Sequence, residues 1–383
     1  MSTKSLIFGD KVLLVIILLL SLFSFFPVFS SSSYLSYVVD GSSPIYYLVK
    51  HLIVLLFGII LMLSVKLVPF KLFKGMSLIL LPIGLALLAY TLSQGTIIGG
   101  SAASRWIDIP LIGIGFQTSS FAAIIIITYT ARYLSKVKLS ETKFSQTLLP
   151  LWLPIFAYIF LILPANFSSA FLIFSALFVV FIISGFPLRH LFKMFLILTL
   201  LLIIFFLTAK AFPEKLPNRI DTWISRVENF GSNKNSDASY QIERAKMAIN
   251  NGGLIGIGAG KSIMKNHLPQ SNSDFIFAII VEEYGIIGGS LIIVLYILMF
   301  FRILVITHRT DDRFGKILVS GLGIFIIMQA FTNISVATQI IPVTGQNLPL
   351  ISSGGSSAWM TCISLGMILS VSSSIKNMNS EKE

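Results

Sequence analysis

Carboxylates are the residues of this chain that could most readily do chemistry, because only 16 of its 383 residues are Asp or Glu. Three of them, Asp274, Glu282 and Glu283, lie at the start of and inside a long apolar run over 275–301. A carboxylate in hydrocarbon is unfavourable unless it is paired or hydrated. Acids in such a run are therefore functional candidates that could transfer protons or bind cations.

The position of Asp274 ahead of this run has two interpretations. Ser273-Asp274 directly before an apolar run fits the N-cap of a helix, where a short polar side chain binds free amides. If 275–301 is a helix, Glu282 lies roughly 12 Å from Asp274 along its axis, and Asp274 lies at the outer mouth, within reach of water and lipid headgroups. Glu282 and Glu283 are interpreted as structural residues that fix helix packing through buried hydrogen bonds. The residue types alone leave both roles of Asp274 open.

A glycine-rich stretch over 256–262 looks like a phosphate-binding loop. Ile255 occupies the position of the first glycine that the nucleotide motif requires, so that interpretation fails. We expect the glycines to form a tight re-entry toward the membrane instead. Lys261 and Lys265 beside them could contact an anionic headgroup.

The stretch 342–357 contains two prolines and many small polar residues, which predicts non-helical backbone near the membrane surface. Ser356 and Ser357 at its end could help to bind a phosphate at a helix start. Small residues of this kind could equally pack between helices.

The other titratable residues give weaker signals. Four histidines are scattered without the spacing of metal ligands: His51, His190, His267 and His308. The single cysteine, Cys362, can form neither an internal disulfide nor a CxxC metal site. Seven acids fall in connections or termini, where we expect solvated side chains: Asp10, Asp40, Glu141, Asp311, Asp312, Glu381 and Glu383.

Composition places the chain in a membrane. It is 55% hydrophobic and 11% charged, with a mean hydropathy of +0.89, whereas soluble domains carry about 25% charged residues. We therefore expect an all-α integral membrane protein, a single polytopic membrane domain over 1–383. Ten apolar runs have membrane-spanning length: 12–28, 46–65, 76–92, 115–133, 148–163, 170–186, 194–212, 275–301, 317–340 and 353–371.

The basic residues predict the orientation. If the first segment is inside, the inside short segments hold 17 Lys and Arg, and the outside ones hold only Lys50 and Arg105. This is the positive-inside pattern, and it places both termini in the cytoplasm. The net charge of +12 does not indicate nucleic-acid binding, because the basic residues gather at the ends of apolar runs and not along one face.

One connection, 213–273, is much longer than the others and is expected outside the membrane, before the eighth span. Connections of this length usually have a function or are disordered. Within it, 239–250 has apolar residues at helical spacing and charged residues opposite, which predicts an amphipathic helix at the membrane surface.

A set of motifs in one order along the chain resembles the SEDS family (shape, elongation, division and sporulation). The set covers most of the chain from Gly100 onward: Gly100 to Trp106, Tyr240-Gln241, Ala248-Ile249, Gly252-Gly253, Leu268-Pro269, Ser273 to Ala278, Glu282 to Gly285, Gln329, Asn333 and 342–357. Gln117 and Asn333 are taken as packing residues.

The resemblance implies a glycosyltransferase that polymerises lipid II into peptidoglycan at the outer face of the bacterial cytoplasmic membrane. The family's essential acid falls on Asp274, which would be the general base for the attacking hydroxyl. Arg105, Lys261 or Lys265, or a divalent cation such as Mg or Mn, would stabilise the departing undecaprenyl pyrophosphate. Implied partners are a class B penicillin-binding protein, the transpeptidase, and other membrane proteins of the divisome or elongasome.

The chain departs from the family's pattern in one respect. Gln117 to Ser120 stands where the family usually reads Gln-Pro-Ser-Glu, Ala123 stands for a lysine and Asn166 for an aspartate. An intramembrane charge pair is therefore missing, and the cation near Asp274 has to be sought elsewhere. The stretches 100–121 and 348–357 favour the division member over the elongation member.

Two other functions fit parts of the sequence. A lipid II flippase or an ion-coupled transporter would explain Glu282 and Glu283 inside an apolar run and a broken helix near 342–357. Against a transporter, the chain has no repeated halves, and its best acid lies near the outer surface. The third hypothesis is a scaffold that only holds a partner synthase.

Overall fold

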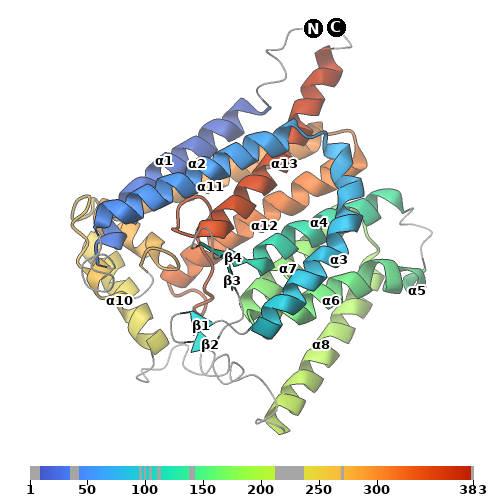
Figure 1. Cartoon of the computed structure of the whole chain (residues 1–383), viewed down its shortest axis with the longest axis horizontal. Helices are drawn as coiled ribbons and strands as arrows, with labels where there is room; N and C mark the ends of the chain where they lie inside the picture. The colour runs from blue at the N-terminus through green and yellow to red at the C-terminus, as the bar shows by residue number, and fades with distance from the viewer. Residues whose placement is uncertain are drawn as a thin grey trace.

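The computed structural model describes residues 9–34, 43–94, 97–98, 101–102, 106–109, 114–137, 143–211, 237–268 and 271–380. Within these ranges the chain is a bundle of long helices with two small β-hairpins (Figure 1). The helices are α1 (Lys11–Tyr34), α2 (Pro44–Leu67), α3 (Phe70–Gln94), α4 (Thr118–Lys136), α5 (Phe144–Thr147), the π-helix η2 (Leu148–Trp152), α6 (Leu153–Ile162), α7 (Phe167–Ile183), α8 (Leu188–Ala211), α10 (Asp237–Gly252), the 3₁₀-helix η4 (Met264–Asn266), α11 (Ile276–Arg309), α12 (Arg313–Ala337) and α13 (Gly355–Ser380).

Each predicted apolar run falls on a helical stretch of the described chain, with α5, η2 and α6 together forming the fifth. Among the residues that the structure describes, seven stretches are long and apolar enough to cross a membrane: α1, α2, α3, α5 to α6, α11, α12 and α13. Helix α7 is apolar but shorter. The chain is therefore a multi-pass helical membrane protein. The count of ten spans stays a prediction.

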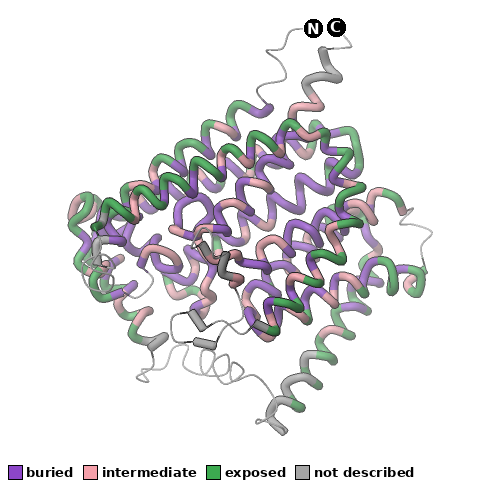
Figure 2. Tube along the Cα trace, in the orientation of Figure 1, coloured by how far each residue is buried: buried purple, intermediate pink, exposed green. Residues whose placement is uncertain are grey.

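The helices divide into a central and a peripheral group (Figure 2). Helix α12 lies in the centre, with 78% of its span buried, whereas α3 has 22% buried and presents apolar side chains outward. Glycines allow the close approach of neighbouring helices: a Cβ on Gly366 of α13 would lie 2.6 Å from the carbonyl oxygen of Met62 in α2. Close packing through small residues is how membrane helices associate without a hydrophobic driving force.

Two antiparallel hairpins interrupt the otherwise helical chain, which an all-α prediction did not anticipate. Strands β1 (Ile97–Ile98) and β2 (Ser101–Ala102) form one, and β3 (Trp106–Ile109) and β4 (Ile114–Gln117) form the other. The run predicted to span from 115 therefore begins as strand β4 and becomes helical only at Thr118.

Helix α11 consists of two helices joined at a break. Gly285 has φ 68° and ψ −173°, a left-handed conformation that favours glycine. The second half, 286–309, is roughly 36 Å long at 1.5 Å per residue, sufficient to cross a bilayer. Its first residues, Ile286 and Ile287, are 51% and 65% exposed, whereas Ile276 to Glu283 are all buried. The two halves therefore have different surroundings.

Main-chain groups of the loop 253–258 fill this break. They satisfy backbone donors and acceptors that an interrupted helix leaves open. Four hydrogen bonds do so: Ile257 N to Glu282 O and Gly258 N to Glu283 O (3.0 Å each), Ile286 N to Gly253 O (2.9 Å) and Ile287 N to Leu254 O (3.3 Å).

The prediction of a solvated Asp10 is wrong. Its carboxylate is paired with Arg302 of α11, with Nε at 2.7 and 2.8 Å and a terminal guanidinium nitrogen at 2.6 Å. It also accepts a hydrogen bond from the Leu13 amide of α1 at 2.9 Å. These bonds fix the start of α1 against α11.

Candidate functional site

Asp274 lies in the turn 271–275 that leads into α11, and it is 8% exposed. Helix α11 begins at Ile276, with Phe275 at the N-cap position and no side-chain capping bond. The interpretation of Asp274 as the N-cap of this helix is therefore wrong. Burial of this carboxylate needs another reason, because charged groups are buried at a cost.

Asn333 of α12 holds the backbone of this turn. Its Nδ2 donates to the carbonyl of Asp274 at 2.9 Å and to the carbonyl of Gln346 at 2.7 Å. The Gln346 side chain in turn donates to Ser169 Oγ of α7 at 2.9 Å. Asn333 thus joins the turn to the loop before α13 through one buried amide, and its packing role stays a prediction.

The loop 342–354 is bound to the same turn at two further points. Ser352 Oγ donates to the carbonyl of Ser273 at 2.6 Å, and the Ser353 amide donates to the carbonyl of Asn272 at 2.9 Å. Within the loop, Leu350 has φ +67°, a conformation costly for a residue with a side chain. Strain of this kind persists only where the surroundings fix the backbone, and it is frequent at functional sites.

A cavity of about 300 Å³ opens where the turn, the loop, α2 and the second hairpin meet. This volume is at the lower end of the range for small-molecule sites. Its lining combines a cation, aromatic rings, polar side chains and glycine backbone: Tyr47, Lys50, His51, Val54, Trp106, Gly115, Asn272, Asn347, Ser353, Gly354 and Gly355. Among the described residues, the lining includes Asn272 but not Asp274, two positions further along the turn.

The first turn of α13 positions the hairpin that carries Trp106. Ser356 Oγ donates to the carbonyl of Gly115 at 2.8 Å and accepts from the amide of Gln117 at 2.9 Å. Gln117 lies opposite Trp106 in the strand register, and its side chain accepts from Ser120 Oγ at 2.9 Å. Gln117 therefore has contacts that match its predicted packing role.

The hydroxyl of Ser356 is thus occupied within the protein. Ser357 is also buried, at 5% exposed. Both serines fit the packing alternative better than the phosphate contact predicted for them. Gly354 and Gly355, together with Asn347 and Ser353, are the residues of this stretch that line the cavity.

Glu282 lies in a closed network with residues before α11. Its carboxylate accepts from Ser262 Oγ, from the amides of Ile263 and Met264 at 3.3 Å and from Asn251 Nδ2 at 3.3 Å. Glu282 is 0% exposed. Its hydrogen bonds agree with the predicted structural role.

Glu283 belongs to the same network and connects it to α1. Its Oε1 accepts from Ser30 Oγ and from the amide of Ser262, the latter at 3.3 Å. Lys265 Nζ donates to Ser30 Oγ at 3.2 Å and to the carbonyl of Gly260 at 2.7 Å. The Lys265 ammonium is therefore engaged with the glutamate network, and the Lys265 carbonyl accepts a hydrogen bond from Ser271 Oγ of the turn at 3.5 Å.

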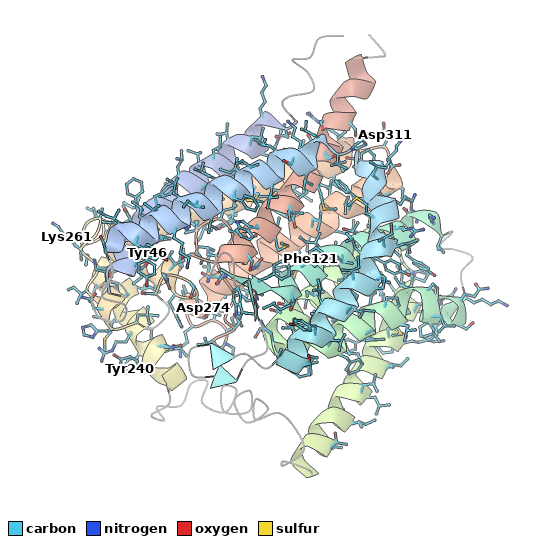
Figure 3. All side chains as sticks on the ribbon, in the orientation of Figure 1. Tyr46, Phe121, Tyr240, Lys261, Asp274 and Asp311 are labelled. Carbon is cyan, nitrogen blue, oxygen red and sulfur yellow. The ribbon has the colours of Figure 1, made fainter. Side chains whose placement is uncertain are left out.

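Lys261 is likewise remote from Asp274. Figure 3 places Lys261 at the edge of the molecule and Asp274 near its middle. Arg105, the third cation predicted near Asp274, lies outside the described residues. The structure thus separates Lys261 from the acid, and the Lys265 ammonium is bound to Ser30 and Gly260.

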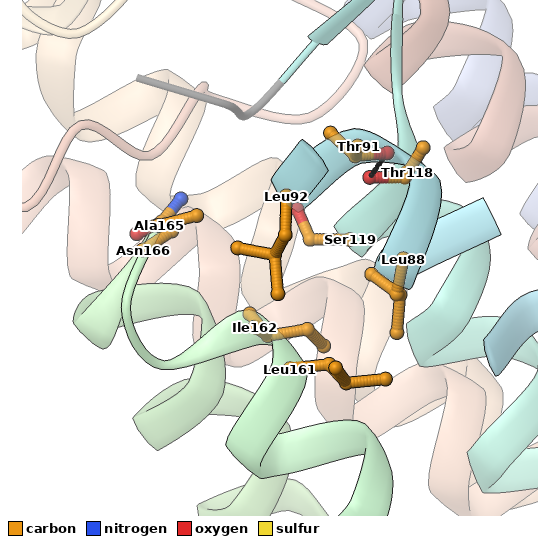
Figure 4. Close-up of a pocket in the computed structure, with 9 residues that line it drawn as sticks. All are labelled: Leu88, Thr91, Leu92, Thr118, Ser119, Leu161, Ile162, Ala165 and Asn166. Atoms are coloured by element: carbon orange, nitrogen blue, oxygen red, sulfur yellow. Dashed lines mark hydrogen bonds between the residues drawn. The ribbon is translucent and has the colours of Figure 1, made fainter. Parts of the chain in front are cut away.

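Two positions at which the chain departs from the expected family pattern, Thr118 and Asn166, line one pocket (Figure 4). A small pocket of about 10 Å³, the size of a single water site, is lined by Thr118, Ser119 and Asn166 together with residues of α3 and α6. Thr91 Oγ1 donates to Thr118 Oγ1 at 3.1 Å. Asn166 caps α7 by accepting from the Ser169 amide at 3.2 Å.

Sequence reasoning missed the residues of α2 that line the cavity. Tyr47, Lys50 and His51 lie at the start of an apolar span, where side chains of their type are usually interfacial. One signal was present: Lys50 is one of only two basic residues in the predicted outside short segments. Lys50 is therefore an exception to the positive-inside pattern, and a basic residue of this kind is a candidate for a functional role.

Comparison with known proteins identifies the family. Residues 10–377 match the sequence model of the FtsW/RodA/SpoVE family, described as a cell cycle protein. The chain belongs to this family. The expected SEDS membership is therefore confirmed, because the match covers nearly the whole chain.

FtsW and SpoVE proteins are among the relatives. The chain is 30% identical to a protein named as a probable peptidoglycan glycosyltransferase FtsW from Nitrosococcus halophilus, over 86% of this chain and 83% of that protein. It is 30% identical to a protein of the same name from Halomonas elongata, over 95% and 90%. It is 29% identical to the stage V sporulation protein E of Bacillus subtilis, over 95% and 96%.

Two solved structures share the fold. One is a chain from a study of a peptidoglycan synthase complex that coordinates polymerisation and crosslinking, with a TM-score of 0.74, 23% identity, and coverage of 96% of this chain and 98% of that one. The other is the rod shape determining protein RodA of Thermus thermophilus, with a TM-score of 0.67, 22% identity, and coverage of 95% and 96%.

Proposed function

We propose that this chain is a peptidoglycan glycosyltransferase that polymerises lipid II at the outer face of the bacterial cytoplasmic membrane. Family membership over residues 10–377 and the names of the relatives support this activity. The observation that carries it is the polar cavity of about 300 Å³ beside the turn of Asp274. A cation, two aromatic rings and main-chain groups suit a phosphorylated sugar.

The proposed topology has ten spans, both termini in the cytoplasm and the segment 213–273 outside. The helical stretches and the distribution of basic residues, 17 inside against two outside, support it. Helix α10 covers the predicted amphipathic stretch, and its Ala245 and Ala248 are 1% and 0% exposed. A Cβ on Gly252, the last residue of α10, would lie 2.0 Å from the carbonyl oxygen of Val281. The outer segment would thus cover the first half of α11.

In the proposed reaction, a sugar hydroxyl attacks the anomeric carbon of a second lipid-linked sugar. A new C–O bond forms, the bond to the lipid pyrophosphate breaks, and Asp274 accepts the hydroxyl proton. General-base catalysis of this kind contributes about 10²–10⁴-fold. Catalytic hydrogen bonds often form only in the substrate complex, so the position of Asp274 two residues after the lining residue Asn272 is compatible with the role.

We assign the phosphate contact to Lys50 in place of Lys261 and Lys265. Lys50 lines the cavity, whereas Lys265 is bound to Ser30 and Gly260. A fixed cation stabilises negative charge that develops on a leaving group. Arg105 precedes Trp106, which also lines the cavity, and stays a candidate for the same role.

A divalent cation would neutralise pyrophosphate charge in the same way. No group of three or more His, Cys, Asp or Glu that could hold a metal occurs among the residues described here. Asp274, in the turn that borders the cavity, is the acid that we propose as a ligand for an Mg or Mn ion.

The proposed partner is a class B penicillin-binding protein that cross-links the new strands. The fold likeness to a chain of a peptidoglycan synthase complex supports a transpeptidase partner. We place the complex, with other divisome membrane proteins, at the division site. A tagged copy should then gather at midcell, whereas even labelling of the side wall would indicate elongation.

The decisive experiment incubates the purified full chain, with and without its partner, with fluorescent lipid II. Glycan chains detected on a gel support the proposal. Transfer of lipid II between leaflets of a vesicle without polymer would identify a flippase instead. If polymer forms only when the partner is present, and forms equally well with the Asp274→Asn variant of this chain, the chain is a scaffold.

A further inference from the structure

The ring of His51 has no role in the reaction described above, although it lines the cavity next to Lys50. His51 is 3% exposed. The ring of Phe25 from α1 packs edge-on against it, with centroids 5.5 Å apart and an interplanar angle of 76°. Its orientation is therefore fixed by α1.

The hydrogen bonds of Ser24 determine which ring nitrogen carries the hydrogen. Ser24 Oγ lies 2.8 Å from His51 Nε2 and 2.6 Å from the carbonyl of Ser21. A serine hydroxyl has one hydrogen, and a carbonyl can only accept. Ser24 therefore donates to Ser21, and its oxygen accepts from His51, so Nε2 is the protonated nitrogen.

The other nitrogen is then a bare acceptor. In a neutral imidazole with hydrogen on Nε2, Nδ1 carries a lone pair and no hydrogen. His51 Nδ1 has no hydrogen-bond partner within the described part of the chain. Because His51 lines the cavity, this lone pair is available to a ligand there.

We propose that His51 Nδ1 accepts a hydrogen bond from a hydroxyl or amide N–H group on the saccharide part of the substrate. This inference rests on the proposed function, because it takes the cavity as the site for a lipid-linked sugar. A lone pair attracts a donor and repels an anion, whereas the ammonium of Lys50 attracts an anion. Two successive residues of α2 thus distinguish the sugar end of the ligand from its pyrophosphate.

Two substitutions separate this role from a structural one. Asparagine carries its polar atoms at the δ position, so His51→Asn keeps an acceptor near Nδ1 and loses the contact with Ser24. Glutamine carries them at the ε position, so His51→Gln keeps the contact with Ser24 and loses the acceptor. One neutral hydrogen bond corresponds to about a tenfold change in binding. We expect His51→Gln to raise KM for lipid II about tenfold with kcat unchanged, and His51→Asn to stay within about threefold of wild type.

The matched control is His190→Phe, which changes a buried histidine of α8 that packs against Phe144 and Phe186. Its KM should equal that of the wild type. If His51→Gln keeps the wild-type KM while His51→Asn loses thermal stability and activity, His51 is structural and the inference is overturned. The proposed function fails separately, if the wild-type chain makes no polymer.

Discussion

Asp274, in the turn before α11, and Glu282, in its first half, are both buried acids, yet their surroundings differ in kind. The carboxylate of Glu282 accepts hydrogen bonds from a side-chain hydroxyl, a side-chain amide and main-chain amides. The turn of Asp274 is held through its backbone carbonyls and borders a cavity. Burial of an acid therefore does not identify chemistry. The two acids differ in position as well, because the turn of Asp274 borders the cavity, whereas the hydrogen-bond partners of Glu282 do not line it.

The largest effect is expected at Asp274, the acid whose turn borders the cavity. Asp274→Asn removes the proposed base but keeps the size of the side chain, so polymerisation should fall by about 10²–10⁴-fold. The thermal midpoint in detergent should change little. The control is Asp311→Asn, which alters an exposed acid between α11 and α12. Full polymerase activity of Asp274→Asn on purified lipid II would remove Asp274 from the mechanism.

The next effect tests the junction between the loop 253–258 and α11. A Cβ on Gly256 would lie 2.2 Å from the carbonyl oxygen of Glu283, at φ +90°. Gly256→Ala should therefore cost about 3 kcal/mol or more through displaced backbone and strain. Gly253→Ala is the matched control, because Gly253 also has a positive φ of +51° but open space at the Cβ position. Equal thermal midpoints of the two variants would contradict the close packing.

A smaller loss is expected from the glutamate network itself. Glu282→Gln replaces an acceptor oxygen by a donor that faces the Ser262 hydroxyl and main-chain amides, so about 1–3 kcal/mol of stability should be lost. The fraction of the variant that stays folded should keep the wild-type KM for lipid II, since Glu282 does not line the cavity. Glu243→Gln on the exposed face of α10 should be neutral in the same thermal assay.

The smallest effect compares the two candidate lysines. Lys50→Ala should raise KM for lipid II about tenfold through loss of one charge-assisted contact, whereas Lys261→Ala should stay within about twofold. Steady-state kinetics of both variants at one ionic strength provide the measurement. The reverse order would return the phosphate contact to the glycine-rich loop.

The helices and the start of α11 near residue 275 could be predicted because they depend on local sequence: apolar length and the switch from polar to apolar residues at 275. The break in α11 could not, since Gly285 alone does not reveal that a loop some thirty residues earlier supplies its hydrogen bonds. The cavity was missed for the same reason. Lys50 and Ser353 line one space, although about 300 positions separate them in the chain.

The loop that fills the break in α11 acts through amides and carbonyls, which every residue type except proline provides in full. Its side chains are therefore under little selection from this contact, and exposed Leu254 and Ile255 should drift among relatives. Positions 252, 256 and 285, where backbones nearly touch, should stay glycine. Sequence conservation at this junction between the loop and α11 is therefore expected at its glycines.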